Sequence, residues 1–159
     1  MQSTLIKSLI EGEVPFVLIG GMAAVAHGSS LMTRDLDVCV PVEAATFLRI
    51  QSALVSHNPR VRAGSGWIPL DLSQEFADRL RNLYVVTDLG KLDCLGEVAG
   101  IGDYQAALAD SIELQLDGRS CRTLSLDALI RSKEAMGRPR DLLAVTELRA
   151  LRESSRGDE

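Results

Sequence analysis

The apolar positions of the N-terminal half follow two different repeats. Residues 3–13 and 43–56 carry apolar side chains three and four positions apart, which predicts amphipathic helices, the first with Ser3 as its cap. Residues 14–20 and 35–42 are instead short, mostly apolar runs bounded by Gly and Pro, which is typical of strands. Between them, residues 22–28 are expected to form a short helix that ends at Gly28.

The C-terminal half shows the same two patterns in a different order. Strands are predicted over residues 83–88 and 91–95, on either side of a turn at Gly90. The Asp-Gly pair between residues 112–116 and 119–124 predicts a two-residue hairpin. Helices are expected over the following segments: residues 125–137, capped by Ser125 and stopped by Gly137, and residues 138–153, with Pro139 in the first turn.

Two further segments complete the prediction. Residues 57–67 are rich in turn formers and are expected to be a loop, and residues 73–82 are expected to be helical. The chain therefore reads as a mixed α/β (α+β) protein with a small mixed β-sheet flanked by helices. We expect one domain over residues 1–159, with a sheet-containing core in 1–124 and a helical C-terminal portion in 125–159.

Composition adds limits to this picture. The 159 residues are 46% hydrophobic, so one core of aliphatic side chains is expected, and the net charge of −5 argues against a protein that neutralises nucleic acid over its whole surface. Between residues 131 and 156, bases outnumber acids, which indicates either a local anion site or a solvated helix face. No leader or membrane-spanning pattern is present in the sequence, so we expect a cytoplasmic protein with no membrane partner.

The cysteines predict no chemistry of their own. Cys39, Cys94 and Cys121 have no metal-ligand spacing, and each lies within a predicted strand segment. We expect free cysteines that act as small apolar side chains.

Two acids interrupt the strand predicted over residues 35–42. Because side chains alternate along a strand, Asp35 and Asp37 share one face while Leu36 and Val38 point to the other. Two carboxylates so close together repel each other unless a cation lies between them, and oxygen ligands favour Mg²⁺ or Mn²⁺. The alternative is a polar strand edge without a metal.

Further residues around this pair point to phosphate chemistry. Gly20 and Gly21 join a strand to a helix, where free backbone N–H groups favour a phosphate. Asp93, flanked by apolar residues in the strand predicted over 91–95, is a third acid of the kind that completes a two-metal site. An EF-hand and a P-loop are excluded, because the required spacings of oxygen donors, glycines and lysine are absent from these segments.

These segments resemble the nucleotidyltransferase fold of polymerase-β type. The resemblance rests on residues 16–40, with their strand, Gly-Gly turn, short helix and T-R-D-L-D-V motif, on G-K-L-D-C-L at 90–95, and on the helix pair that contains Lys133, Arg138 and Asp141. It is particularly close to small bacterial AbiE-type and minimal nucleotidyltransferases. It implies transfer of a nucleoside monophosphate from an NTP to an acceptor hydroxyl on RNA or tRNA, a protein or a small molecule. Because some of these relatives are toxins, it also implies a possible toxin role with an antitoxin as partner.

The resemblance also implies site residues. Asp35, Asp37 and Asp93 would be both the catalytic acids and the ligands of two Mg²⁺ or Mn²⁺ ions. The residues implied for binding the nucleotide are Gly20, Gly21, Thr33, Arg34, Lys133 and Arg138. Leu31 stands where relatives often carry a basic residue, which leaves open an alternative function: a non-catalytic nucleotide-binding or partner-binding module that retains the fold.

Overall fold

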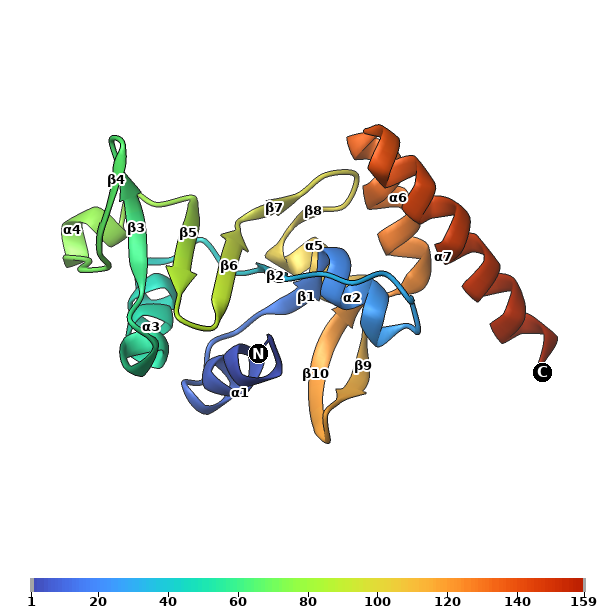
Figure 1. Ribbon diagram of the computed structural model, residues 1–159, viewed down its shortest axis with the longest axis horizontal. Coiled ribbons are helices and arrows are strands. Elements are labelled where there is room, and N and C mark those ends of the chain that lie inside the picture. The colour runs from blue at the N-terminus through green and yellow to red at the C-terminus, as the bar shows by residue number, and fades with distance from the viewer. Residues whose placement is uncertain (1, 159) are drawn as a thin grey trace.

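The computed structural model, which describes residues 2–158, is built around one eight-stranded mixed sheet (Figure 1). Its strand order is β4-β3-β5-β6-β2-β1-β10-β9. The pairs β2–β6 and β1–β10 are parallel, and the other neighbours are antiparallel. The strands of this sheet are β1 (Val17–Ile19), β2 (Asp35–Cys39), β3 (Arg60–Ala63), β4 (Gly66–Pro69), β5 (Asn82–Thr87), β6 (Gly90–Leu95), β9 (Ser111–Leu116) and β10 (Arg119–Leu124).

The remaining elements connect or cover these strands. The short strands β7 (Glu97–Val98) and β8 (Gly102–Asp103) form a separate pair. The helices are α1 (Gln2–Glu11), α2 (Gly20–Ala26), α3 (Ala44–Leu54), the 3-10 turn η1 (Val55–His57), α4 (Gln74–Ala77), α5 (Tyr104–Ala109), α6 (Leu126–Met136) and α7 (Pro139–Gly157). The predicted fold class, a mixed sheet flanked by helices with a helical C-terminal part, is confirmed. No helix between residues 2 and 158 combines the length and the apolarity needed to cross a membrane.

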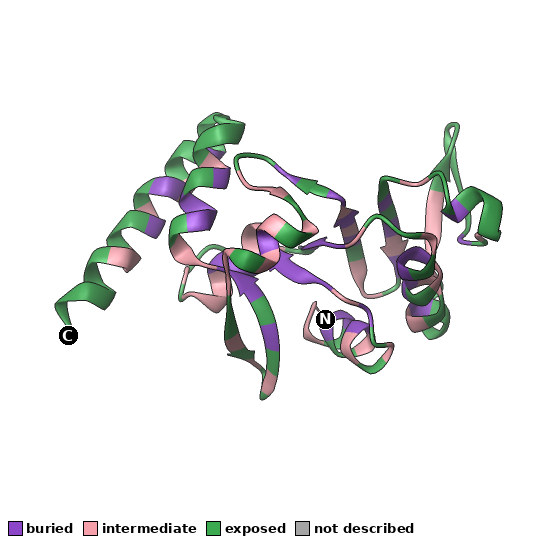
Figure 2. Ribbon diagram, turned by 180° about the vertical axis from the view of Figure 1, so that it is seen from behind, coloured by how far each residue is buried: buried purple, intermediate pink, exposed green. Residues whose placement is uncertain are grey.

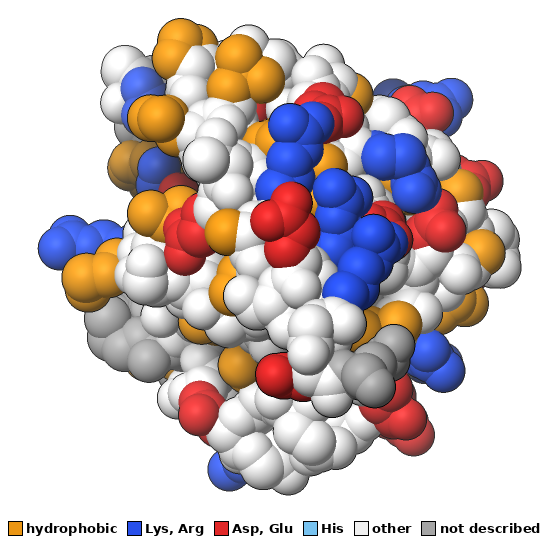
Figure 3. Space-filling model, turned by 90° about the vertical axis from the view of Figure 1, so that its right-hand side faces the viewer, with side chains coloured by type: hydrophobic (Ala, Val, Ile, Leu, Met, Phe, Trp, Pro, Cys, Tyr) orange, Lys and Arg blue, Asp and Glu red, His pale blue; other side chains and the backbone are white. Residues whose placement is uncertain are grey.

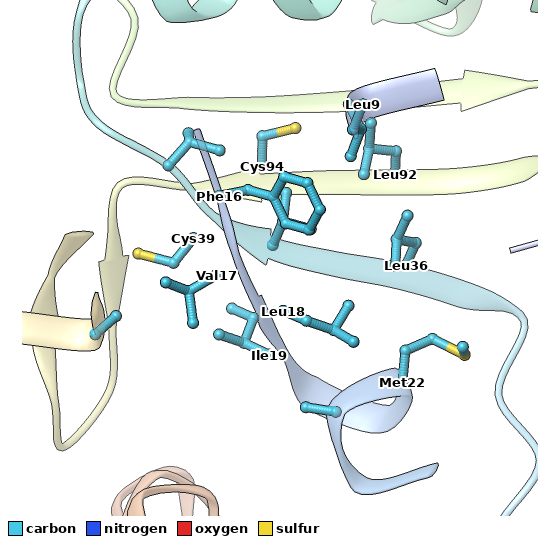
Figure 4. Packing of buried hydrophobic residues seen from close by; sticks show 14 of the residues in the cluster. Leu9, Phe16, Val17, Leu18, Ile19, Met22, Leu36, Cys39, Leu92 and Cys94 are labelled. Carbon is cyan, nitrogen blue, oxygen red and sulfur yellow. The ribbon is translucent and has the colours of Figure 1, made fainter. Parts of the chain in front are cut away.

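One face of the central strands forms the core. Leu36 and Val38 of β2 and Leu92 of β6 are fully buried. They belong to the same apolar cluster as the inward side chains of α1 and α3, and Figure 4 shows Leu9, Phe16 and Leu92 among the side chains of this cluster. Since neighbouring residues of a strand point to opposite faces, Asp35, Asp37 and Asp93 lie on the other face.

The C-terminal helices pack against each other at one end of the sheet (Figure 1). As predicted, the Ser125 hydroxyl accepts a hydrogen bond from the Ala128 amide (3.2 Å), and Gly137 ends α6 in the left-handed conformation (φ 65°). Pro139 is the first residue of α7. Buried residues gather in the middle of the sheet, whereas β4, α4 and much of α7 are exposed (Figure 2).

Several predicted elements are wrong. Residues 57–67 were expected to be a loop, but they contain β3 and lead into β4, a hairpin that turns at Gly64. All four residues of β4 are exposed, so the apolar alternation that identifies a strand is missing there. Only Gln74–Ala77 of the helix expected over 73–82 is helical, because Asn82 already belongs to β5. Ser3 lies inside α1 rather than capping it, and α5, β7 and β8 were not predicted.

The cysteine prediction is confirmed. All three cysteines are free and buried, at Cys39 in β2, Cys94 in β6 and Cys121 in β10. Burial raises the pKa of each thiol, that of Cys39 to about 11. The thiols are therefore protonated near neutral pH and act as packing groups.

Candidate active site

Two parallel strands bring the three acids together. In the register of β2 and β6, Asp37 lies opposite Asp93 and Asp35 lies opposite Lys91. Residues opposite each other on neighbouring strands point to the same face, and the strands themselves are about 4.8 Å apart. Asp35, Asp37 and Asp93 therefore share the face of the sheet that α1 and α3 do not cover.

Burial and mutual repulsion change the proton affinity of these carboxyls. The pKa of Asp37 is raised to about 6, chiefly by burial and then by the charges of Asp93 and Asp35, while Lys133 opposes the shift. The pKa of Asp93 is raised chiefly by burial and then by Asp35, with Lys91 opposing. The site thus favours either a proton or a cation among its carboxylates at neutral pH.

The donor set fits magnesium that is shared with a phosphate. Among residues 2–158, no group of three or more His, Cys, Asp or Glu side chains is placed so that these side chains alone could hold a metal ion. Mg²⁺ is usually bound through one or two carboxylates together with substrate phosphates and water, rather than by an all-protein cage. The oxygen-only chemistry of Asp35, Asp37 and Asp93 on one open face suits that kind of site.

Gly20 gives Asp37 the space that it occupies. Gly20 has φ +65°, and a Cβ built on it would lie 2.5 Å from Oδ2 of Asp37. A side chain at this position would therefore displace the carboxylate as well as strain the backbone. Gly20, where β1 passes into α2, therefore packs directly against Asp37 of β2.

A cleft of about 360 Å³ lies between the acids and the C-terminal helices. Asp35, Asp37 and Asp93 line one side with Gly20, and the hydroxyl-bearing ring of Tyr84 contributes beside them. The cations that line the other side are Lys133, Arg138 and Arg140. A cleft with carboxylates facing cations can hold a metal–phosphate pair, since each charge then has an opposite partner.

The cations of the cleft differ in their partners. Asp141 is almost fully buried and accepts hydrogen bonds from Nε (2.5 Å) and Nη2 (3.1 Å) of Arg138, while Nζ of Lys133 lies 3.6 Å from it. These bonds lower the pKa of Asp141 and fix the start of α7. Arg140 has no ion-pair partner within the described chain, so its charge is available to a ligand.

Most of the remaining bases in the C-terminal run are neutralised. Arg131 pairs with Asp110 (2.6 Å) and Arg152 with Asp127 (3.0 Å), and Arg149 pairs with Glu134 between α6 and α7. Figure 3 shows Lys and Arg side chains gathered in a band, with Asp and Glu beside them, on the side of the molecule where these helices lie. Outside the cleft, the local excess of bases therefore forms an ion-paired helix surface.

Three residues expected at the nucleotide do not line the cleft. The Thr33 hydroxyl donates a hydrogen bond to the Asp35 carbonyl (3.2 Å), and a Cβ on Gly21 would lie 3.0 Å from the Thr33 side chain. Gly21 and Thr33 thus pack together and hold the segment before β2. Arg34 is exposed, as is Leu31, and neither lines the cleft.

Sequence reasoning missed two residues of the cleft. Tyr84 was assigned to a strand, but its place opposite Asp93 depends on the pairing of β5 with β6, which no local pattern reveals. Arg140 was hidden in a basic run, where it resembled the ion-paired arginines around it. Its unpaired charge in the cleft distinguishes it only once the helices are packed.

Comparison with solved structures supports the fold. The crystal structure of ANT(2'')-Ia in complex with adenylyl-2''-tobramycin matches with a TM-score of 0.56 at 14% identity, over 99% of this chain and 95% of that one. The solution structure of the antibiotic-resistance factor ANT(2'')-Ia matches with a TM-score of 0.55 at 16% identity, over 99% and 90% of the two chains. No protein-family model and no curated protein matches the chain. ANT(2'')-Ia is an aminoglycoside nucleotidyltransferase, and the chain shares its nucleotidyltransferase-type fold.

Proposed function

We propose that the protein is a metal-dependent nucleotidyltransferase that moves a nucleoside monophosphate from an NTP to an acceptor hydroxyl. The observation that carries this proposal is the placing of Asp35, Asp37 and Asp93 on one open face, opposite Lys133 and Arg140. The similar fold of ANT(2'')-Ia, whose crystal structure holds an adenylylated aminoglycoside, supports the same class of reaction.

Asp35, Asp37 and Asp93 are the residues that would hold Mg²⁺ or Mn²⁺, in the two-ion arrangement that the resemblance implies. When bound there, the metal would neutralise charge on the triphosphate and lower the pKa of the acceptor hydroxyl. Burial and the neighbouring acids raise the pKa of Asp37 to about 6, so a cation beside this carboxylate would relieve the cost of its buried charge.

The protein's own groups account for the remaining steps. Lys133 and Arg140 bind phosphate oxygens, and Gly20 lets the chain approach the ligand beside Asp37. The acceptor oxygen forms a bond to the α-phosphorus, the bond from that phosphorus to the bridging oxygen breaks, and pyrophosphate leaves with the electron pair. Asp93 accepts the proton of the attacking hydroxyl.

The test separates binding from transfer. Asp37→Asn should abolish Mg-dependent NTP binding, since it removes a charge from the metal site. Asp93→Asn should keep the affinity for Mg-NTP within a few-fold, yet reduce transfer of label from an α-labelled NTP to components of a cell extract by about 10²-fold or more. Asp71→Asn is the matched control, because Asp71 is an exposed acid outside the cleft.

Two outcomes would count against this function. If Asp35→Asn and Asp37→Asn both bind Mg-NTP like the parent, the acids do not form a metal site. If the parent binds Mg-NTP but labels nothing with any of the four nucleotides, the alternative of a non-catalytic nucleotide-binding module replaces the enzyme. The toxin role, the antitoxin partner, the AbiE-type relationship and a cytoplasmic location stay predictions.

A further inference from the structure

A second hollow of about 260 Å³ adjoins the cleft on its other side. Asp35, Asp93 and Tyr84 line both spaces, so the acids stand between them. The first space extends toward α6 and α7, whereas the second extends over β5 toward the hairpin β3–β4, at the opposite end of the sheet (Figure 1). Apart from these shared residues, the side chains that line the second hollow were given no role in holding the nucleotide.

Strand register places an unusual set of side chains in this hollow. Tyr84 lies opposite Asp93, and Arg62 lies opposite Trp67, so each pair points to one face. Counting strands from β6, Tyr84 is one strand from Asp93 and Arg62 is two strands away, or about 10 Å at the usual spacing. A row of groups therefore leads away from the acids along the open face.

The aromatic side chains of this row are available to a ligand. Trp67 is 48% exposed and Tyr84 is 56% exposed, although both line a hollow. The guanidinium carbon of Arg62 lies 5.4 Å from the centre of the Trp67 ring, which makes a stacked cation–aromatic pair. Exposed aromatic and guanidinium planes of this kind stack well on the flat bases of nucleotides.

The charged side chains of the hollow also limit which class of acceptor it can bind. Arg62 and Lys91 are exposed cations that line it, and neither has an ion-pair partner in the described part of the chain. Asp35 and Asp93 balance these charges in the metal-free hollow, but with a metal held by the acids, as proposed above, Arg62 and Lys91 favour an anionic group such as a phosphate and oppose an acceptor with several ammonium groups. The two acids in the hollow lie where the proposed reaction needs them, next to the hydroxyl.

The direction of attack assigns the hollow to the acceptor. In phosphoryl transfer the attacking and leaving oxygens are roughly in line across the phosphorus. If the triphosphate is bound toward Lys133 and Arg140, the attacking hydroxyl enters from the side of the acids away from these cations. The hollow of Arg62, Trp67 and Tyr84 lies on that side.

We propose that this hollow binds the acceptor and that the acceptor is a nucleotide unit, with a base stacked on Trp67 and Tyr84 and a phosphate near Arg62 and Lys91. This proposal rests on the proposed function, which it deepens by naming the class of acceptor. The shared chemistry is a base with a neighbouring phosphate, whether in a free nucleotide or at the end of a single strand.

The experiment uses the natural fluorescence of Trp67, which is the only tryptophan of the chain. The full-length protein is first saturated with a non-hydrolysable Mg-NTP analogue and then titrated with a nucleoside 5′-monophosphate, the same nucleoside without phosphate, or a short single-stranded RNA. Quenching of Trp67 by the phosphorylated probes is expected, with at least about tenfold weaker binding of the unphosphorylated nucleoside. Much tighter binding of the RNA identifies a strand end, and equal binding identifies a free nucleotide.

Variants assign the effect to the hollow. Tyr84→Ala and Arg62→Gln should each weaken binding of the phosphorylated probes by about tenfold, and Arg62→Gln should also reduce the advantage that the phosphate gives. Phe76→Leu is the matched control, because Phe76 is an aromatic residue of α4 that is 57% exposed and lies outside the hollow. Mg-NTP affinity should stay within twofold in Arg62→Gln.

A further variant separates a failure of this proposal from a failure of the proposed function. Asp37→Asn should lose Mg-NTP binding but retain quenching by the probe, so a failure of the metal site leaves the test of the hollow intact. The proposal is overturned if no phosphorylated probe quenches Trp67, if the quenching disappears once the NTP cleft is filled, or if a polycationic aminosugar quenches more strongly than the nucleotide.

Discussion

Replacing Gly20 by alanine should destabilise the protein through two separate effects. Gly20 has φ +65°, a conformation that costs a residue with a side chain about 1–2 kcal/mol. The added Cβ would also lie 2.5 Å from Oδ2 of Asp37 and 3.2 Å from its Cβ, and such overpacking costs about 1–3 kcal/mol. We therefore expect a loss of about 2–5 kcal/mol in the free energy of unfolding, measured by urea denaturation.

Gly64→Ala is the control that isolates the contact. Gly64 has nearly the same backbone angle, φ +59°, but a Cβ built on it has no neighbour within 4 Å. Gly64→Ala should thus lose only the backbone cost of about 1–2 kcal/mol. In the double variant Gly20→Ala/Asp37→Ala the steric cost should largely disappear, which gives a coupling energy of about 1–3 kcal/mol.

The same substitution should remove binding. Because the Cβ of alanine displaces the Asp37 carboxylate, Gly20→Ala should weaken Mg-NTP binding at least about tenfold, whereas Gly64→Ala should leave it unchanged. Calorimetric titration measures both. Equal destabilisation by Gly20→Ala and Gly64→Ala, or a Gly20→Ala cost that persists without the Asp37 side chain, would refute the packing of Gly20 on Asp37.

Further predictions concern charge. Because the pKa of Asp37 is raised to about 6 in the folded protein, the free energy of unfolding should fall as pH rises from about 4 to 6. In EDTA, Asp37→Asn should therefore be more stable than the parent by about 1–2 kcal/mol at pH 8, after allowance for solvent screening, and almost equally stable at pH 4. Thermal unfolding at the two pH values measures this difference. An equal gain at both pH values would contradict this. Lys133→Ala and Arg140→Ala should weaken Mg-NTP binding in calorimetry by about 1.5–3 kcal/mol, with Arg140→Ala leaving the melting temperature unchanged. Arg138→Ala should lower the melting temperature as well, because the buried Asp141 loses its main partner; an unchanged melting temperature would show that Arg138 does not brace α7.

The glycines between β1 and α2 and the paired acids of β2 were predictable because the residues that identify them are close together in the sequence. The shared face of Asp35 and Asp37 follows from the two-residue period of any strand, and the structure shows both on the open face. The same holds for α6, whose cap at Ser125 and stop at Gly137 are encoded within the helix and its flanks. Such features depend on residues that are near one another in sequence.

The features that sequence reasoning missed depend on distant partners. β4 was not recognised because each of its residues is exposed, and an edge strand without a buried face has no apolar alternation. Tyr84 reaches the cleft only through the register of β5 with β6. Arg140 differs from the ion-paired bases around it in forming no ion pair within the described residues, which is a property of the packed helices rather than of the sequence.

The structure also explains why the site and the core of β2 cannot vary independently. A shift of one residue in the pairing of β2 would turn Asp37 into the core and Leu36 or Val38 into the cleft, because each face takes every second residue. The fully buried Leu36 and Val38 therefore hold the acids in place, and Gly20 fixes Asp37 from the other side. Arg140 has no such constraint, since it is exposed on α7. Changes at Arg140 should consequently alter ligand binding alone, whereas changes in β2 should alter binding and folding together.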